Sequence, residues 1–401
     1  MLIALTLLTT LVTLVLLVRP KMVGWDYWRA TATPLASIIG SGFLVSVPIL
    51  RDVVGQWAVL AMIALLILSY LIGAAIRDNI ANVEPRMENG DAGTPMVVER
   101  LSHLTLSFAY FVSVAYYLVL FATFLLKSLG IADAILAKMI VTGILLLIAV
   151  IGVWRGFRAV ERLEIYAVSA KLAIIAGLLV ALMLFDGSEL VDGGRQASTI
   201  AGHFQLSELP VLMGLLILVQ GFETSRFLGS AYPPQMRIKT MKDAQLLSAA
   251  IYVGFFLLMI PLMGADSKET GVAAIVDILR PVSLLLPLLI TFGALASQSS
   301  AAVADAIGAG GLLNDITKGR IPIRYTYPWI AGISAIVTWE TDVFSLIAFA
   351  SRCFALYYAL QCLVAAMSAR DRGLPVRAAW YGALMLVCAA IVVFGTPAEG
   401  G

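Results

Sequence analysis

The sequence predicts an all-α polytopic membrane protein with about twelve transmembrane helices, and three observations support this prediction. Of its 401 residues, 61% are hydrophobic and 13% are charged, about half the charged share of a soluble domain. Apolar runs long enough to cross roughly 30 Å of hydrocarbon recur along the chain. Their centres lie near residues 10, 41, 66, 116, 146, 173, 218, 252, 292, 332, 354 and 385. Basic residues concentrate in every second loop, as the positive-inside rule predicts for this number of crossings.

The loops expected in the cytoplasm hold six groups of three basic residues, 18 of the 27 in the chain. The other loops are sparser in basic residues and carry acidic ones such as Asp186 and Glu189. This predicts a protein of the cytoplasmic (inner) membrane with both termini outside the cytoplasm. A net charge of +2 without a long basic tract gives no reason to expect nucleic acid as a partner. The groups are Arg19, Lys21, Arg29; Arg77, Arg86, Arg100; Arg155, Arg158, Arg162; Arg237, Lys239, Lys242; Lys318, Arg320, Arg324; and Arg370, Arg372, Arg377.

The residues that enzymes and metal sites use are scarce and scattered. The two histidines, His103 and His203, are expected near loops on opposite sides of the membrane, and the chain has no CxxC motif and no P-loop. Cys353, Cys362 and Cys388 lie in apolar stretches and are interpreted as small hydrophobic residues. We therefore expect no catalytic residues, no metal and no cofactor.

Two of the apolar runs are interrupted at related places. Gly40 and Gly42 interrupt the second run, and the stretch Gln220-Gly221-Phe222-Glu223 interrupts the seventh. Interrupted helices five places apart are typical of transporters built from two inverted repeats. The predicted organisation is one transport domain, 1–401, with an extra N-terminal helix at 1–22, repeats at 30–186 and 205–368, and a C-terminal helix at 376–395.

We expect the substrate site where the two interrupted helices meet. Unwound backbone offers N–H groups to a carboxylate and C=O groups to an ammonium, which together suit a zwitterionic amino acid. The alternative is that the glycines only permit close packing of helices. The predicted substrate-binding residues are Ile39, Gly40, Ser41, Gly42, Phe43, Gln220, Gly221, Phe222 and Glu223.

These motifs are similar to those of a known family. The stretch Ile39-Gly40-Ser41-Gly42-Phe43, followed by Pro48, resembles the first-helix signature of amino acid-polyamine-organocation (APC) superfamily permeases. Gly221-Phe222-Glu223, with the later Tyr232-Pro233-Pro234, resembles the family's GFE motif and inner loop. The resemblance runs from about Thr31 to Ala366. It implies a LeuT-like 5+5 inverted repeat and secondary transport of amino acids or related amines by alternating access.

Lys171 lies deep in the sixth run, about nine residues beyond Arg162. The resemblance implies that a lysine here replaces the sodium ion of sodium-coupled relatives, beside Ser299 and Ser300. It therefore predicts transport that is proton-coupled or an exchange and is not sodium-dependent. The alternative is a lysine whose amine reaches back to the cytoplasm.

Other charges at membrane depth are rare and usually functional. We expect a buried charge network of Arg226, Asp305 and Arg352. Arg226 is expected to pair locally with Glu223, three residues earlier. Arg352 needs Glu223 or Asp305 as its partner, either as a structural ion pair or facing an anionic substrate.

Two further functions stay open at this point. The first is a transporter of the same fold for another small solute or an inorganic ion. The second is a membrane sensor or partner subunit that transports nothing. The partners expected in each transport case are a small-molecule substrate, protons and the lipid bilayer, and the oligomeric state is left open.

Overall fold

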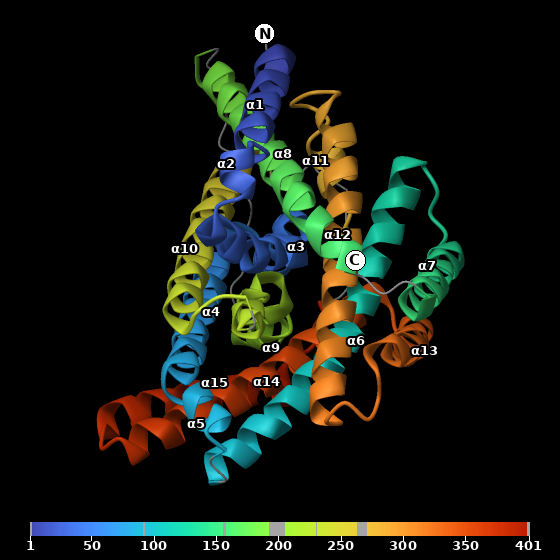
Figure 1. The fold of residues 1–401 in the computed structure, drawn as a ribbon. Coiled ribbons are helices and arrows are strands. Elements are labelled where there is room, and N and C mark those ends of the chain that lie inside the picture. The colour runs from blue at the N-terminus through green and yellow to red at the C-terminus, as the bar shows by residue number, and fades with distance from the viewer. Residues whose placement is uncertain are drawn as a thin grey trace.

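The protein is a bundle of long helices in the computed structural model, which describes residues 2–398 except 91–92, 155–157, 192–204, 230 and 263–270 (Figure 1). No strand occurs among these residues. For residues 41, 88, 158–164, 187–191 and 315 the structure describes the backbone but not the side chains.

Each of the expected segment centres falls within a helical element of this bundle. The long helices are α1 (Leu2–Leu17), α3 (Asp26–Val54), α4 (Ala58–Asn82), α6 (Thr94–Ser128), α7 (Ala134–Trp154), α8 (Arg158–Val191), α10 (Pro234–Met259), α12 (Leu286–Ile316), α13 (Thr326–Glu340), α14 (Val343–Asp371) and α15 (Pro375–Phe394). The seventh segment is built from the short helix α9 (Leu209–Met213) and two 3₁₀ helices, η3 (Leu216–Val219) and η4 (Phe222–Leu228). The other short helices are α2 (Pro20–Val23), α5 (Glu84–Glu88), α11 (Ile275–Ile278), η1 (Gly55–Trp57), η2 (Leu206–Glu208), η5 (Ile260–Leu262) and η6 (Ile323–Tyr325).

Local sequence chemistry sets several helix starts. Pro95, Pro234 and Pro375 stand in the first turn of α6, α10 and α15, where the missing N–H of proline costs no hydrogen bond. Asp342 caps α14 by accepting hydrogen bonds from the backbone N–H groups of Phe344 and Ser345. These residues start helices at positions that hydropathy alone does not define.

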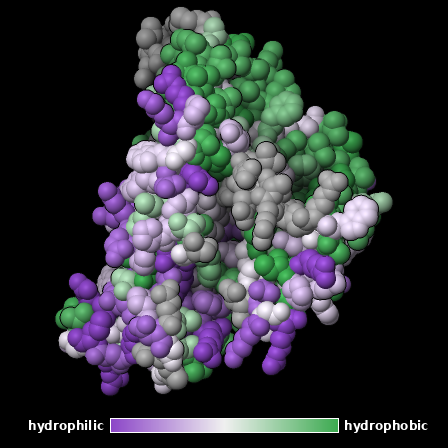
Figure 2. All heavy atoms as spheres, viewed as in Figure 1, coloured by the Kyte–Doolittle hydropathy of each residue, from purple (hydrophilic) through white to green (hydrophobic). Residues whose placement is uncertain are grey.

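The bundle is apolar enough to cross a membrane many times. Eight stretches of the described residues have the length and composition of membrane spans, and the first of them contains both α3 and α4. On the face shown in Figure 2, hydrophobic residues cover much of the upper part, and hydrophilic residues gather towards the lower end. The stretches are 26–87, 94–128, 134–154, 165–186, 234–262, 286–314, 343–371 and 375–394.

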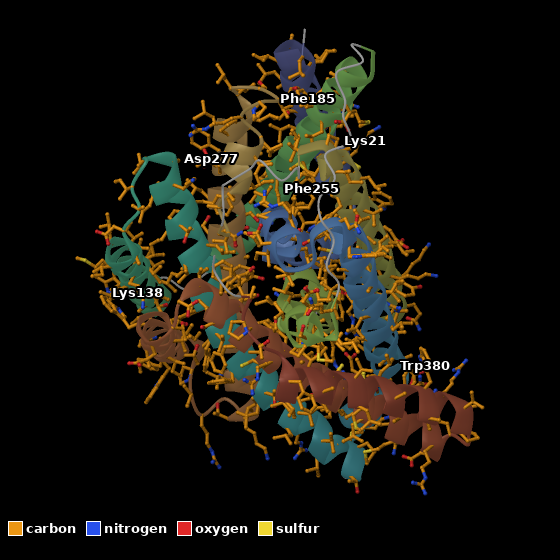
Figure 3. All side chains as sticks on the ribbon, turned by 180° about the vertical axis from the view of Figure 1, so that it is seen from behind. Lys21, Lys138, Phe185, Phe255, Asp277 and Trp380 are labelled. Carbon is orange, nitrogen blue, oxygen red and sulfur yellow. The ribbon has the colours of Figure 1, made fainter. Side chains whose placement is uncertain are left out.

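The helices pack around α3 and the seventh segment. Helix α3 contacts η3, η4, α8, α10 and α12, while α6 packs against α12 and α14. Helices α1, α7 and α15 lie outside this group, on α8, α13 and α14. Seen from behind in Figure 3, Phe255 of α10 lies towards the centre of the molecule, whereas Lys138 and Trp380 lie at its edges. The centre of the protein is therefore the contact of α3 with the seventh segment.

The two expected interruptions have different outcomes. Helix α3 runs without a break from Asp26 to Val54, through Gly40 and Gly42, so the prediction of a broken second segment is wrong. The seventh segment is broken at Gln220 and Gly221. A glycine pair lowers helix propensity, but packing against neighbouring helices can keep such a stretch helical.

Candidate functional site

The break in the seventh segment is a defined turn with its own hydrogen bonds. Gln220 is extended, and Gly221 has φ +116°, which residues with a side chain rarely adopt. The N–H of Gly221 donates to Glu223 Oε2 (3.0 Å), and the hydroxyl of Thr224 donates to the Gly221 carbonyl (2.7 Å). Glycine is thus required at the bend, and the residues after it hold the bend closed.

Helix α3 lies directly against this break. A Cβ atom on Gly221 would lie 2.6 Å from the backbone carbon of Ser37, and one on Gly42 would lie 2.5 Å from Leu218 Cα. Both distances are shorter than real Cβ contacts, so the backbones meet closely only because both residues are glycine. At Gly42 this supports the alternative that the glycine permits close packing.

Side chains from three other helices bind backbone carbonyls of α3 beside the break. In each case a buried group donates a hydrogen bond to an oxygen near the glycines: Lys171 Nζ to Ala36 (3.0 Å), Tyr252 Oη to Ile38 (3.1 Å) and Gln298 Nε2 to Gly40 (3.3 Å). Backbone carbonyl oxygens that accept hydrogen bonds from side chains were expected where a helix is unwound. Here they occur in α3, which stays helical. The helix serves as an acceptor surface for α8, α10 and α12.

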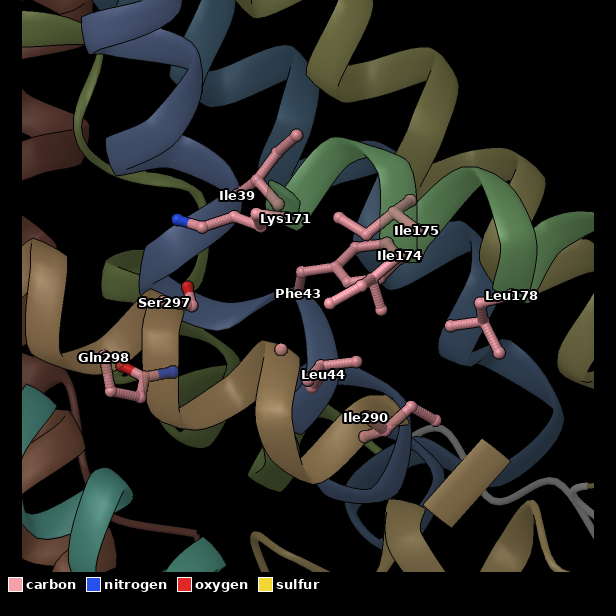
Figure 4. Close-up of a pocket in the computed structure, with 11 residues that line it drawn as sticks. Ile39, Phe43, Leu44, Lys171, Ile174, Ile175, Leu178, Ile290, Ser297 and Gln298 are labelled. Carbon is pink, nitrogen blue, oxygen red and sulfur yellow. The ribbon is translucent and has the colours of Figure 1, made fainter. Parts of the chain in front are cut away.

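Lys171 is buried at this surface. The residue is 5% exposed, and its Nζ would lie 3.1 Å from a Cβ atom at Gly40. In Figure 4 its amine extends along α3 between Ile39 and Ser297. It lines a cavity of about 20 Å³, with Phe43 among the apolar walls, enough for roughly one water molecule. The alternative of an amine that reaches the cytoplasm does not hold.

Neither of the two serines expected beside Lys171, Ser299 and Ser300, lines the cavity of that lysine. Ser297 and Gln298 of α12 line the Lys171 cavity, whereas Ser299 donates to its own helix at Leu295 (2.8 Å) and Ser300 lines a different cavity. The reason is the helical period, because Asp305, Ala301 and Ser297 are spaced by four and share the buried face. Counting back from Asp305 at intervals of four residues would have identified Ser297.

The remaining residues of the break are buried and packed against α6 and α14. Glu223 Oε2 accepts a hydrogen bond from Tyr358 Oη (2.8 Å), and the Phe222 ring stacks on Tyr358 with centroids 5.1 Å apart. Gln220 Nε2 donates to Tyr117 Oη (2.7 Å). Glu223 is fully buried, and its other oxygen, Oε1, has no hydrogen-bond partner in the described part of the chain. That oxygen is an available acceptor at the break.

A larger cavity of about 380 Å³ lies next to the break, within the size range of small-molecule sites. It reaches the surface at the exposed residues Arg29 and Ala231. Its walls come from α3, α6, α8, α12 and the segment after Gly221, and they include Ala36, Ser37, Tyr110, Thr224, Ser300 and Asp305. None of the nine predicted substrate-binding residues lines this cavity, although Ser37 and Thr224 are their close neighbours. Ile39 and Phe43 line the smaller cavity instead, and the side chain of Ser41 lies outside the described residues.

Arg226 belongs to a buried polar network that sequence reasoning missed. Its Nη2 lies 2.8 Å from Glu99 Oε1, so the expected local pair with Glu223 is wrong. The amide of Gln361 joins the same group, donating to Glu99 Oε2 (3.0 Å) and to Ser102 Oγ (2.7 Å). A lone glutamine inside the apolar helix α14 was the available signal, as was the spacing of Glu99, Ser102 and His103 on one helix face.

Arg352 does not belong to a buried network. The residue is exposed, and its Nε donates to the carbonyl of Val392 (2.7 Å) near the C-terminal end of α15, where a cation is favoured by the helix dipole. Arg352 thus meets neither Glu223 nor Asp305, and the grouping of Arg226, Asp305 and Arg352 is wrong. The buried basic residues of the described chain are Arg51, Arg77, Lys171, Arg226 and Arg237.

Residues considered for other chemistry take no part in this site. The three cysteines are buried free thiols, His103 lies beside Glu99, and His203 lies outside the described residues. Within the described ranges, no group of three or more His, Cys, Asp or Glu side chains is placed to hold a metal ion.

Known proteins are similar to this chain in sequence or in fold. A family model described as an APC superfamily transporter matches residues 20–395. An uncharacterized protein of Aquifex aeolicus (strain VF5) is 40% identical over 377 residues, covering 93% of this chain and 91% of the relative. Among solved structures, the fold is similar to that of the manganese transporter of Eremococcus coleocola in complex with an aromatic bis-isothiourea substituted compound. That likeness has a TM-score of 0.56 at 13% identity and covers 93% of this chain and 87% of the other.

The apolar bundle and these matches define a multi-pass membrane transporter. The chain belongs to the APC superfamily of transporters. The structural likeness, at 13% identity, shows the fold alone.

The bend at Gly221 can be tested by adding one methyl group. We expect Gly221→Ala to destabilise the protein by about 1–3 kcal/mol, because φ +116° is strained for alanine and the new Cβ meets Ser37. We also expect it to weaken ligand binding. Gly311→Ala in α12 is the matched control, since its Cβ would meet nothing within 4 Å. Thermal unfolding in detergent compares the two, and equal stability of both variants would contradict the assigned role of the bend.

Proposed function

We propose that the protein is a secondary transporter of amino acids or related amines. It works by alternating access in the cytoplasmic membrane, with proton coupling or exchange and without sodium. The observation that carries the proposal is the break at Gly221 packed on α3, where Glu223 offers a buried oxygen without a hydrogen-bond partner among the described residues. An ammonium group is the complement of such an oxygen.

The packing of the helices supports an inverted 5+5 repeat. If α3, α4, α6, α7 and α8 form the first repeat, then the seventh segment, α10, α12, α13 and α14 form the second. When each helix is replaced by the helix five places along, one observed contact becomes another observed contact. The contact of α6 with α14 becomes that of α12 with α8, and the contact of α3 with α10 becomes that of η3 or η4 with α4. The contact of α3 with α8 becomes that of η3 with α14. Exchange of this kind is what a two-fold relation between repeats produces.

The larger cavity supplies a route to the break from one side of the membrane. Its surface end, at Arg29 and Ala231, belongs to the side that the basic loops assign to the cytoplasm. In this arrangement the protein is open inward. Transport then requires a second arrangement in which this route closes and one opens on the other side.

Lys171 is the proposed coupling group. Its ammonium donates to the Ala36 carbonyl, and Ala36 also lines the larger cavity. The Lys171 ammonium links α8 to α3 through this hydrogen bond, and loss of its proton would weaken that link. Movement of α3 during transport can thus be tied to the protonation of Lys171.

A ligand screen tests the proposal. Purified protein is heated with a panel of amino acids, amines, small anions and Mn²⁺, and we expect amino acids or amines to raise the unfolding temperature. The shift should be largely lost in Glu223→Gln and kept in Asp371→Asn, whose exposed carboxylate lies near Arg86. Stabilisation by Mn²⁺ or by anions alone would contradict the proposed substrate class. Stabilisation by an amino acid without flux into liposomes would identify a sensor instead.

A further inference from the structure

Asp305 is a buried carboxyl group on the wall of the larger cavity. It lies in α12, is 3% exposed and lines the cavity together with Tyr110 and Gly308. The cavity, of about 380 Å³, has room for water and reaches the surface at Arg29 and Ala231. Carboxyl groups at membrane depth are rare, and proton pathways are one of their main uses. Asp305 is therefore a buried acid that water can reach from the side assigned to the cytoplasm.

No basic side chain of the described chain forms an ion pair with Asp305. The charged group that acts on it is Glu223, which has the same sign. Lys171 donates to a backbone carbonyl of α3, and Arg226 pairs with Glu99. A carboxyl group in this setting is stabilised by a proton, which removes the charge that burial penalises.

The other titratable groups around Asp305 do not supply a positive charge at this position. Tyr110 and Tyr117 of α6 lie within electrostatic range of it. Arg29 of α3 is exposed at the mouth of the cavity, with Asp26 at 3.8 Å. Among the described residues of the other elements that pack on α12, no further charge acts on Asp305. These elements carry Tyr166 in α8, Asp277 in α11, Arg324 and Tyr325 in η6, and Tyr327 and Glu340 in α13.

Ser113 of α6 gives Asp305 two hydrogen-bond arrangements. Its hydroxyl lies within hydrogen-bond distance of Asp305 Oδ2 and also of the Tyr110 carbonyl, which is 3.1 Å away. A hydroxyl group has one hydrogen and two lone pairs. When Asp305 is ionised, Ser113 donates that hydrogen to the carboxylate. When Asp305 is protonated, the acid donates to Ser113 Oγ and Ser113 donates to the Tyr110 carbonyl, so both states are hydrogen-bonded.

We propose that Asp305 is a proton-binding site that is filled and emptied through the larger cavity. The proton passes between the carboxyl oxygen and water in the cavity, and the Ser113 hydroxyl turns between its two acceptors in the same step. The inference rests on the proton coupling in the proposed function and deepens it, because Asp305 carries a proton in addition to that of Lys171. Closure of the cavity during alternating access separates Asp305 from cytoplasmic water, which is the condition for moving this proton together with the substrate.

Infrared spectroscopy tests proton binding without transport. Spectra of the purified protein in acidic and alkaline buffer are subtracted, and we expect the C=O band of a protonated carboxyl group that is absent in Asp305→Asn. Asp371→Asn, which removes an exposed carboxylate near Arg86, is the matched control and should keep that band. Ser113→Ala should move the pH at which the band titrates, whereas Ser113→Thr, which keeps the hydroxyl, should restore it.

Proton counting tests the part that Asp305 has in transport. The number of protons moved per substrate molecule is measured in sodium-free proteoliposomes. It should fall by about one in Asp305→Asn, because the amide of asparagine does not take up a proton in place of the carboxyl group. Accumulation at a given pH gradient should fall with it but should not vanish, in contrast to Lys171→Ala.

The outcomes separate this site from the proposed function. If uptake is proton-driven but the band of Asp305 does not titrate, or the proton count is unchanged in Asp305→Asn, the transporter assignment stands and the proton site is wrong. If the band titrates but no amino acid or amine is transported, the proton-binding site stands and the proposed function is wrong.

A chemical label keeps the proposal testable if Asp305→Asn does not fold. Dicyclohexylcarbodiimide reacts with protonated carboxyl groups in apolar surroundings, and mass spectrometry locates the label on the wild-type chain. Asp305 should be labelled in acidic buffer and spared in alkaline buffer. Absence of the label, or equal labelling in both buffers, would overturn the proposal.

Discussion

Lys171→Ala should abolish proton-driven uptake of substrate into proteoliposomes. The reason is that the Lys171 ammonium is the group that binds the Ala36 carbonyl of α3 from α8, and alanine can neither make this bond nor carry a proton. Uptake driven by an imposed pH gradient should fall to the level of empty liposomes. Exchange of labelled for unlabelled substrate, which requires no net proton movement, should persist in part.

A second lysine provides the control for this experiment. Lys242 lies exposed on α10, and Lys242→Ala should transport as the wild type does. If Lys171→Ala keeps both its uptake and its pH dependence, Lys171 is not the coupling group. If uptake and exchange are lost together while the protein stays folded, the residue is required for the site itself and the coupling role is not supported.

Arg226→Ala should be the most destabilising of the substitutions considered. The change leaves Glu99 buried without its ionic partner and removes a member of the network that ties η4 to α6 and α14. Breaking a buried ion pair from one side costs about 3–5 kcal/mol. The loss should appear as a lower free energy of unfolding by denaturant in detergent micelles.

An exposed ion pair gives the comparison. Arg86 lies 3.4 Å from Asp371 with both side chains partly exposed, and pairs of this kind contribute about 0–1 kcal/mol. Arg86→Ala should therefore be nearly neutral. Combining Arg226→Ala with Glu99→Gln should recover part of the stability, because no unpaired charge stays buried. Equally small losses in the free energy of unfolding for Arg226→Ala and Arg86→Ala would show that the buried pair with Glu99 contributes no more stability than the exposed pair.

Hydropathy was sufficient to place the helical segments, because each expected centre falls within a helical element. Eight stretches of the described residues have the length and composition of membrane spans. Hydropathy also gave the break at Gly221, where a glycine is followed by the polar side chain of Glu223 inside an apolar segment. The same reasoning failed at Gly40 and Gly42, since close packing on Leu218 leaves the helix intact. Whether a glycine breaks a helix or fits beneath a neighbour depends on that neighbour, which the local sequence does not contain.

Side-chain partners were the least predictable part of the site. Arg226 was assigned to Glu223 because the two are three residues apart, but η4 begins after a bend and turns Arg226 towards Glu99 instead. Arg352 was placed at depth by counting residues along α14, whereas its contact with α15 leaves it exposed. Lys171 was predicted to be buried, and the structure confirms this. The residue lies too far from the end of its helix for the side chain to extend to the membrane surface.

Proton-coupled transport without sodium is tested most directly by flux of the best-binding amino acid or amine in proteoliposomes. An inward proton gradient is imposed in sodium-free buffer, and accumulation is followed with and without a protonophore. We expect the substrate to accumulate above its external concentration without sodium, and we expect this accumulation to collapse when the protonophore is added. Absence of uptake and exchange for every amino acid or amine that stabilises the protein, or accumulation only when sodium is supplied, would contradict the proposed function.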